Sequence, residues 1–503
     1  MEKYDLTKKH LYGENHHHIT KIIGILQASN VEESFIRKFY ATVPMLELTN
    51  AEYELYAQLV KNAHEFVQEH NLNEIKIHLY NSIDSEHSII EILSSDKPFL
   101  FDSTMCLLNR LDIEVEKVSH PNIYVNRDET GKIINFDNDG NRELLIQIRT
   151  AHCLSNELIK RVGSELKYVL GLVRYAVNDW KEIVSQLTLY KNDFIKTATL
   201  DKEEQKEFLK LMESKYFVFL GSAKYVFDAD NKPQEQNKLT LGILKPELNE
   251  YEPLFYSTIF TESFFKRSSD LIFIGKINKI SVIHRDANLD YLCLKTLDSE
   301  GRVKEATIFV GLFTSILYYQ SATLIPIIRG KLDYILKKAN FCPNSYAGKE
   351  LVSIVEALPR DELFQTSAEK LYPLIMEIYA LLFSPELRLF IRTRGDTLSC
   401  LLFMPIEQAN ASDNVKRLKA ALAHEYGVII GYNFAQINNS KLCYYYFFID
   451  TKGKNVNEKD FSRVEKELLS ITKSWESGFY ELLINEYGKS QGIKVFNNYS
   501  QAF

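Results

Sequence analysis

The sequence predicts an α+β fold of three ferredoxin-like βαββα units, in which antiparallel sheets carry their helices on one face and helical connectors join the units. Two observations indicate this class. The order strand, helix, strands, helix occurs near both ends of the chain, and the helices have apolar residues at three- and four-residue spacing. The middle of the chain is richer in strands. An amphipathic helix needs a sheet to bury its apolar stripe, so this order favours helices packed on sheets.

The first 200 residues are expected to contain a helical segment, residues 1–74, and a first βαββα unit with a long final helix, residues 75–200. Apolar residues recur at helical spacing over residues 51–70. Pro98 after a strand marks a helix start. The unit's expected strands are 75–80, 89–93, one or more within 113–125, and 144–148, and its last helix passes through Trp180.

Four further segments are expected after residue 200. They are a second, more elaborate α+β unit (201–345), a helical connector (346–385), a third βαββα unit (386–490) and a tail (491–503). The third unit combines a hairpin, a helix that stops near Gly427, two more strands and a last helix. The strands expected after residue 200 are 216–220, 225–227, 239–244, 271–283, 291–297, 306–313, 387–391, 398–404, 428–434 and 442–450.

Length and composition describe a folded, multidomain chain. Its 503 residues suggest three or four domains, and 45% hydrophobic with 25% charged residues excludes disorder as the main state. The net charge of −7 argues against a nucleic-acid-binding protein. The six cysteines are isolated, with no C-x-x-C pair, which is typical of a reduced, cytoplasmic protein without a zinc site.

One segment tests whether the chain enters a membrane. Residues 306–328 contain no charge and are long enough to span a bilayer. Glycine, serine, threonine and glutamine residues interrupt the segment and Pro326 follows them, so a strand, a loop and a helix start are the better interpretation. The polar N-terminus also lacks the apolar stretch of a secretory signal. No membrane partner is expected.

The motifs of common catalytic sites are missing. The sequence contains no G-x-G-x-x-G for a dinucleotide, no G-x-x-x-x-G-K-[ST] phosphate loop, no H-E-x-x-H zinc motif and no G-x-S-x-G elbow. The chain is therefore expected to hold no catalytic residues, no metal and no cofactor of its own.

A polar cluster where a strand passes into a helix is the first candidate ligand site. Free backbone N–H groups at a helix start and short polar side chains can bind a small carboxylate or ammonium group. Ordinary helix capping is the simpler alternative. The candidate residues are Asp96, Lys97, Pro98, Phe99, Asp102 and Ser103.

Two further clusters are candidates for turns or interfaces. His284 and Arg285 lie close in sequence to Asp290, at a turn between strands, where structural hydrogen bonding is the simpler interpretation. Arg360 and Asp361 lie in a helix junction, Pro359–Gln365, where Arg360 could hold an interface carboxylate through a bidentate pair. The aromatic run 444–448 is predicted to be a buried strand, not a platform for stacking bases.

These segments resemble the N-terminal region of the large bacterial-type NAD-specific glutamate dehydrogenases, which contains three ACT-like domains. The resemblance runs in order from about Val31 to Tyr487. It also places an effector loop in the third unit, with Pro405 and Asn410 as candidates. The quoted segments are Ser95–Ser103, Ser119-His-Pro, Tyr216–Gly221, Leu241–Leu244, Val282–Arg285 with Asp290-Tyr291, Phe309–Ser315 and Pro359–Gln365.

The resemblance implies the N-terminal part of a longer enzyme that converts glutamate and NAD to 2-oxoglutarate, ammonia and NADH. By that analogy the chain is not itself an enzyme, and NAD belongs to the full-length protein. The implied partners are the catalytic domain, other subunits of a homo-oligomer and an amino-acid effector. Two alternatives stay open: a purely structural oligomerisation module, favoured by Phe99 where many ACT domains have glycine, and an autonomous enzyme with a catalytic group around His284 and Asp290.

Overall fold

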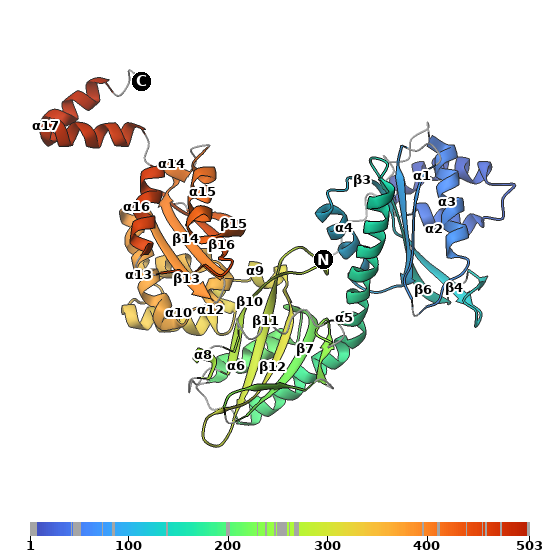
Figure 1. Ribbon diagram of the computed structural model, residues 1–503, viewed down its shortest axis with the longest axis horizontal. Helices are drawn as coiled ribbons and strands as arrows, with labels where there is room; N and C mark the ends of the chain where they lie inside the picture. Colours follow the sequence, from blue (N-terminus) through green and yellow to red (C-terminus); the bar gives the residue numbers. More distant parts are fainter. Residues whose placement is uncertain are drawn as a thin grey trace. The chain divides into compact units, whose positions relative to one another are not determined.

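The computed structural model describes two compact units (Figure 1). Unit 1 comprises residues 1–181, 241–243 and 280–287, and unit 2 comprises residues 182–240, 244–279 and 288–503. The residues outside the description are 1–7, 42, 44–51, 73, 83–85, 137–138, 198–201, 229, 237–238, 246–247, 249–258, 261, 266–270, 395–396, 410–412, 439, 455, 458–459, 473–474 and 500–503.

Unit 1 is built on one antiparallel sheet. Its strand order is β1-β2-β6-β4-β5, and β3 also pairs with β6. The strands are β1 (Lys76–Asn81), β2 (Ser88–Ser95), β3 (Val115–Ser119), β4 (Asn122–Arg127), β5 (Ile133–Asn135) and β6 (Asn141–Thr150). The helices are α1 (Lys8–Ile25), α2 (Glu33–Tyr40), α3 (Tyr53–Val67), α4 (Leu100–Arg110) and α5 (Asn156–Thr197), whose first part belongs to this unit.

Helices cover both faces of this sheet: the two helices of the predicted βαββα unit share one face, and the N-terminal helical segment covers the other. The helices α1 to α3 lie on one side, and α4 and α5 lie on the other (Figure 1). The central strands explain the arrangement, since β2 is buried over seven consecutive residues and β6 over eight. A strand that is apolar on both faces needs cover on both.

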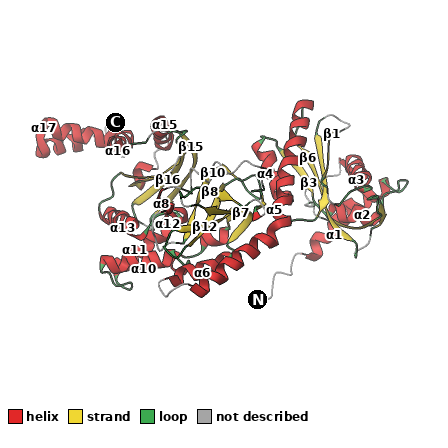
Figure 2. Cartoon of the chain, turned by 60° about the horizontal axis from the view of Figure 1, so that its bottom comes forward, coloured by secondary structure: helices red, strands yellow, loops and turns green. Residues whose placement is uncertain are grey.

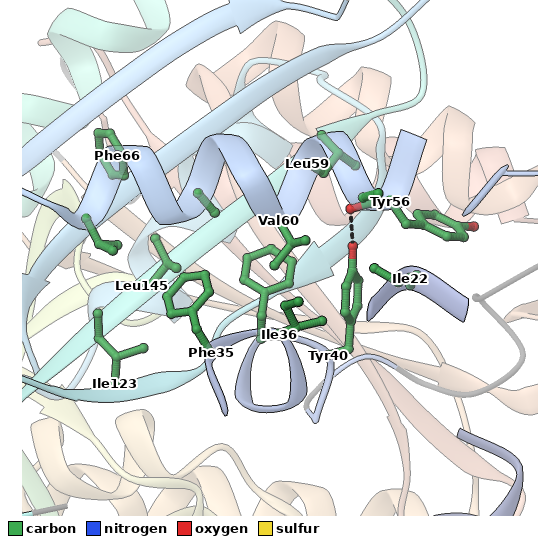
Figure 3. Packing of buried hydrophobic residues seen from close by; sticks show 14 of the residues in the cluster. Ile22, Phe35, Ile36, Tyr40, Tyr56, Leu59, Val60, Phe66, Ile123 and Leu145 are labelled. Carbon is green, nitrogen blue, oxygen red and sulfur yellow. Dashed lines mark hydrogen bonds between the residues drawn. The ribbon is translucent and has the colours of Figure 1, made fainter. Parts of the chain in front are cut away.

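The layer formed by α1 to α3 shares one apolar core with the sheet (Figure 3). Phe35 and Ile36 of α2 and Val60 of α3 pack toward Ile123 and Leu145 of the strands. Within the layer, the buried Tyr40 hydroxyl donates to the carbonyl oxygen of Tyr56 at 2.6 Å. The N-terminal helical segment is therefore an integral part of unit 1.

Unit 2 begins with a second antiparallel sheet, ordered β10-β11-β12-β7-β8. No helix separates β10, β11 and β12, so the described elements of this region do not follow the βαββα order that was predicted. The elements are α6 (Glu203–Met212), β7 (Phe217–Phe227), β8 (Pro233–Glu235), α8 (Glu262–Phe265), β10 (Ile272–Ile280), β11 (Asn288–Leu297), β12 (Val303–Phe313), α9 (Ser315–Tyr319) and the 3₁₀ helix η6 (Ala322–Leu324). The short strand β9 (Leu241–Gly242) belongs to unit 1.

The uncharged segment 306–328 forms most of β12, then α9, η6 and the start of the next helix. A strand, a loop and a helix start were predicted here. Among the described helices, none combines the length and the apolar character needed to cross a membrane.

A close backbone contact in this sheet gives a testable prediction. A Cβ atom at Gly311 of β12 would lie 1.9 Å from the carbonyl oxygen of Val218 on β7, where the register of the two strands shifts. Because the obstacle is backbone, we expect Gly311→Ala to lower the free energy of unfolding by about 1–3 kcal/mol. Urea unfolding followed by circular dichroism measures the loss. Gly171→Ala is the control, since a Cβ there meets no atom within 4 Å.

Four helices connect the second sheet to the third: α10 (Ile328–Ala339), α11 (Tyr346–Ala357), α12 (Arg360–Gln365) and α13 (Ala368–Phe383). The helices α10, α11 and α13 pack against one another (Figure 2). The third sheet has the order β13-β14-β16-β15. Its elements are β13 (Arg388–Arg394), β14 (Thr397–Pro405), α14 (Ile406–Ala409), α15 (Asn414–Tyr426), β15 (Val428–Gln436), β16 (Leu442–Asp450), α16 (Phe461–Thr472) and the following α17 (Trp475–Tyr499).

The third sheet is also covered on both faces. Apolar residues of α15 and α16 form a core with one face. On the other face, the hydroxyl of Tyr444 donates to the carbonyl oxygen of Ala357 at 2.6 Å, and that of Tyr446 donates to Glu362 at 3.0 Å. The aromatic run 444–448 lies in β16, most of which is buried, so the prediction of a buried strand is confirmed.

Candidate effector site

The turn from β2 to α4 is held by side chains of its own unit. The carboxylate of Asp96 accepts from Nε of Arg142 on β6 at 2.8 Å, and the Asp96 N–H donates to the Arg142 carbonyl oxygen at 3.1 Å. Lys97 donates to the side-chain oxygen of Asn178 on α5. The turn is thus fixed to a strand and a helix of unit 1.

Phe99 precedes α4 with a backbone that favours glycine. Its φ of 72° is in the left-handed region, which costs a residue with a side chain about 1–2 kcal/mol. The ring of Phe99 lies 5.0 Å from the ring of His284, between centroids. Such strain persists where surrounding contacts determine the conformation.

The segment 280–287 also belongs to unit 1 and binds the start of α4. The buried Ser103 hydroxyl oxygen accepts from the His284 N–H at 3.0 Å, and Nδ1 of His284 lies 2.9 Å from the Asp102 carboxylate. The φ of His284 is 68°, also left-handed. The structure thus brings together two clusters that the sequence analysis treated separately, and any ligand that uses Asp102 and Ser103 must replace His284.

Cys106, one turn further along α4, does not add a nucleophile to this cluster. Burial raises the pKa of its thiol, and the nearby charge of Asp286 raises it as well. Its Sγ lies 3.6 Å from the carbonyl oxygen of His284. The protonated thiol therefore helps to hold the 280–287 segment.

The hydroxyl of Ser103 gives a direct test of this contact. We expect Ser103→Ala to lower the free energy of unfolding by about 1 kcal/mol, because the His284 N–H loses its acceptor. Amide exchange at His284 should also accelerate, as read by mass spectrometry. The control Ser164→Ala removes an exposed hydroxyl on α5 and should change neither quantity. Unchanged exchange at His284 would contradict the contact.

Asp290 is not part of this site. Its carboxylate is buried in the second sheet, where it accepts from Lys276 Nζ at 2.6 Å and from the Phe313 N–H at 2.8 Å. Burial opposes the charge of Lys276, but attraction to Asp290 and Asp361 holds the pKa of this lysine well above its usual value. His284 and Asp290 bind different partners, so the structure does not assemble the catalytic pair that the third hypothesis required. Arg285 lies next to His284 in the 280–287 segment.

The bidentate pair expected at Arg360 is formed by other residues. Arg360 donates to Glu356 at 2.8 Å and to the Gln320 carbonyl oxygen at 3.1 Å. Instead, Arg392 of β13 donates to both carboxylate oxygens of Glu362: its Nε lies 3.0 Å from Oε2 and its Nη2 lies 2.8 Å from Oε1. Glu362 was not among the predicted site residues, although it lies in the segment Pro359–Gln365. No residue pattern near Glu362 shows that β13 folds back onto α12.

Asp361 lies in the same buried region, with one carboxylate oxygen 3.4 Å from Lys276 Nζ and the other accepting from the Tyr318 hydroxyl at 3.3 Å.

Pro405, a candidate of the third unit, ends β14 opposite Leu442. Asn410 lies outside the described residues. An effector loop in the third unit therefore stays a prediction.

In the part of the chain that the structure describes, no group of three or more histidine, cysteine, aspartate or glutamate side chains could hold a metal ion. The eleven strand pairs with a described register are all antiparallel. A Rossmann-type NAD site needs parallel strands joined by a helix, so these sheets do not fit that kind of site.

Comparison with known proteins defines the class of unit 1. Residues 35–166 match the family described as "Glutamate dehydrogenase, ACT1 domain", and residues 325–382 match "Glutamate dehydrogenase, helical motif 1". The first match contains the turn from β2 to α4, and the second covers α10 to α13. Two regions of the chain are therefore similar to the ACT1 domain and the helical motif 1 of glutamate dehydrogenases.

Whole-chain similarity points to the same family. The chain is 27% identical to the NAD-specific glutamate dehydrogenase of Halomonas elongata, over 94% of this chain and 31% of the relative. It is 24% identical to the Pseudomonas aeruginosa enzyme of that name, over 93% of this chain and 30% of the relative. A Mycobacterium tuberculosis relative of the same name is 21% identical over 67% of this chain and 21% of the relative. These matches support a protein of the glutamate dehydrogenase family, and the chain spans about three-tenths of the length of the first two relatives.

Two expectations are corrected by these comparisons. The prediction that the chain is not an enzyme is overturned, because nearly all of it aligns with proteins named as NAD-specific glutamate dehydrogenases. The prediction of no cofactor in this chain has no support either, since the same relatives are named for NAD. Both predictions relied on missing short motifs and on the resemblance to an N-terminal region.

Proposed function

We propose that the chain serves the NAD-dependent conversion of L-glutamate and water to 2-oxoglutarate and ammonia, and that unit 1 binds an amino-acid effector. The observation that carries this proposal is the match of residues 35–166 to the glutamate dehydrogenase ACT1 domain. Contacts with a catalytic domain and with other copies of the chain would transmit the binding as a coupling free energy.

The proposed effector site is the start of α4. The carboxylate of Asp102 can accept from an amino-acid ammonium group, and the Ser103 hydroxyl can donate to its carboxylate. Both groups are bound to His284 in this structure. An effector therefore competes with the 280–287 segment, and its affinity is reduced by the cost of displacing His284.

A thermal-unfolding screen of the chain tests the proposal. The ligands are each proteinogenic amino acid, 2-oxoglutarate and NAD. An effector that binds only the folded chain adds about 2.7 kcal/mol of stability at one hundred times its dissociation constant. We expect a saturable rise of the midpoint with one or two amino acids, a much smaller rise in Ser103→Ala, and an unchanged rise in Ser164→Ala. NADH formation from glutamate and NAD, followed by absorbance, measures the family's reaction directly.

A second candidate function is a structural oligomerisation module without a small-molecule ligand. The observation in its favour is that His284 is already hydrogen-bonded to Asp102 and Ser103, and that the Phe99 ring packs beside the His284 ring. A flat response to every ligand, together with a stable oligomer by light scattering, would favour this function over effector binding.

A further inference from the structure

The edge strand β15 carries fewer of the usual protections against pairing than the opposite edge, although its register with β16 shifts between Ile429 and Gly431. Among the described strands of its sheet it pairs with β16 alone. Its nine residues, Val428–Gln436, contain no charged residue and no proline. The opposite edge strand, β13, carries Arg388 and Arg392. Because charges and proline on an edge block the addition of another strand, β15 is the edge that is open to one.

A groove of about 880 Å³ lies along this strand, between β15, α15 and the turn after β16. Its walls contain small residues, Ala420 and Ala423 on the helix, Gly427 at the C-cap of α15 and Gly431 on the strand. A Cβ atom at Gly431 would meet no atom within 4 Å. Small residues on both walls allow a second backbone to approach the strand edge.

Half-exposed aromatic rings lie on the helix-covered face of β15. Tyr432 is 48% exposed and Phe434 is 46% exposed. Their rings contact those of Phe447 and Tyr445 in the core of the third sheet, which fixes the face on which they lie. These rings give apolar contacts to alternate side chains of an added strand.

The groove is positively charged although the chain is acidic overall. Lys419, Lys452 and Lys454 line it, and no acidic side chain does. The Lys419 ammonium lies over the Tyr432 ring, 3.2 Å from its centroid, and the Lys452 side chain is 66% exposed and forms an ion pair with Asp450 at 2.8 Å. The chain as a whole has a net charge of −7. The local charge therefore favours a partner with carboxylates.

We propose that an extended peptide segment rich in aspartate or glutamate binds along β15 as an added strand, between β15 and α15. Hydrogen bonds to the free strand edge give affinity for any extended backbone. Tyr432 and Phe434 hold its apolar side chains, and the three lysines select its carboxylates. This partner site lies in the third sheet and is independent of the effector proposed for unit 1.

Fluorescence anisotropy with the full chain tests the site. The probe is a labelled peptide of alternating glutamate and valine, compared with one of alternating lysine and valine. We expect saturable binding of the acidic peptide alone. Replacing Lys419, Lys452 and Lys454 by glutamine should weaken it about tenfold. Lys416→Gln, an exposed lysine of α15 outside the groove, should leave it within about twofold. Methylation of alternate peptide amides should abolish binding.

Three outcomes would overturn the proposal. One is equal binding of the acidic and basic peptides, and another is unchanged binding to the triple variant with an intact circular dichroism spectrum. The third is self-association of the chain at increasing concentration that the triple variant abolishes, since β15 would then belong to a second copy. Failure of the amino-acid screen would leave this site unaffected, because the two tests use different ligands and different units.

Discussion

Replacing Glu362 by alanine is expected to lower the free energy of unfolding by about 2–4 kcal/mol, because it leaves the partly buried Arg392 without its counter-charge. The Glu362 carboxylate is only 5% exposed and accepts from two nitrogens of Arg392 and from the Tyr446 hydroxyl. It connects α12 to β13 and β16, so the loss acts on the packing of the third sheet. Urea unfolding followed by circular dichroism measures it.

The pH dependence of the free energy of unfolding gives an independent test of the ion pair between Glu362 and Arg392. Burial raises the pKa of Glu362, but attraction and hydrogen bonds from Arg392 outweigh burial and hold the pKa below the usual 4.5. A lowered folded-state pKa stabilises the chain above the unfolded value, and this stabilisation is lost as pH falls through the folded value. The difference between wild type and Glu362→Ala should therefore be constant above pH 4.5 and shrink below it.

Two control variants separate the buried pair from surface charge. Glu386→Ala removes a carboxylate that is 53% exposed, and should change stability by less than about 0.5 kcal/mol. The double replacement of Glu362 by leucine and Arg392 by methionine should cost less than Glu362→Ala alone, because no buried charge is left unpaired. A loss below about 1 kcal/mol for Glu362→Ala would contradict the assignment.

The corresponding test in unit 1 is Arg127→Ala, for which we also expect a loss of about 3–5 kcal/mol. Arg127 is 3% exposed and donates to both oxygens of Glu143, which is fully buried, at 2.7 and 2.8 Å. It also donates to the carbonyl oxygens of Gly131 and Val67 at 2.8 and 2.9 Å. The replacement therefore leaves Glu143 with His70 as its remaining partner, at 3.1 Å.

Arg127→Lys distinguishes charge from geometry at this position. Lysine keeps the positive charge but cannot make the forked contact, so an intermediate loss is expected. Burial raises the pKa of Glu143, while Arg127 and His70 lower it below its usual value. Arg127→Ala should therefore raise the pKa of Glu143. The stability that this variant loses relative to wild type should be larger near neutral pH than at acid pH. Arg161→Ala, at a side chain that is 63% exposed, is the control.

Element type and order were predictable because they depend on local patterns. The strand–turn–helix transition at residues 95–100 and the long helix through Trp180 follow from apolar spacing and from Pro98. The buried β16 followed from its continuous apolar run. In β6, polar and charged residues alternate with apolar ones, so the sequence did not show that both faces of the first sheet are covered.

The contacts between distant segments were not predictable in this way. His284 meets Asp102 and Ser103 across about 180 residues of sequence, and Arg392 meets Glu362 across 30. Nothing at either end of these pairs shows its partner, since a charged or hydroxyl side chain looks the same whether it faces water or a buried counterpart. Only the fold decides which of these groups are desolvated, and desolvation makes their pairing matter.

By itself, the sequence determined the α+β class, the positions of most helices and strands, and a resemblance to glutamate dehydrogenases. The tertiary structure decided that both faces of the first and third sheets are covered, that His284 lies at the start of α4, and that β15 is left as an open edge. The physical reason is range: apolar periodicity and turn residues act over a few positions, whereas layer order and ion pairing are set by which surfaces the folded chain brings together.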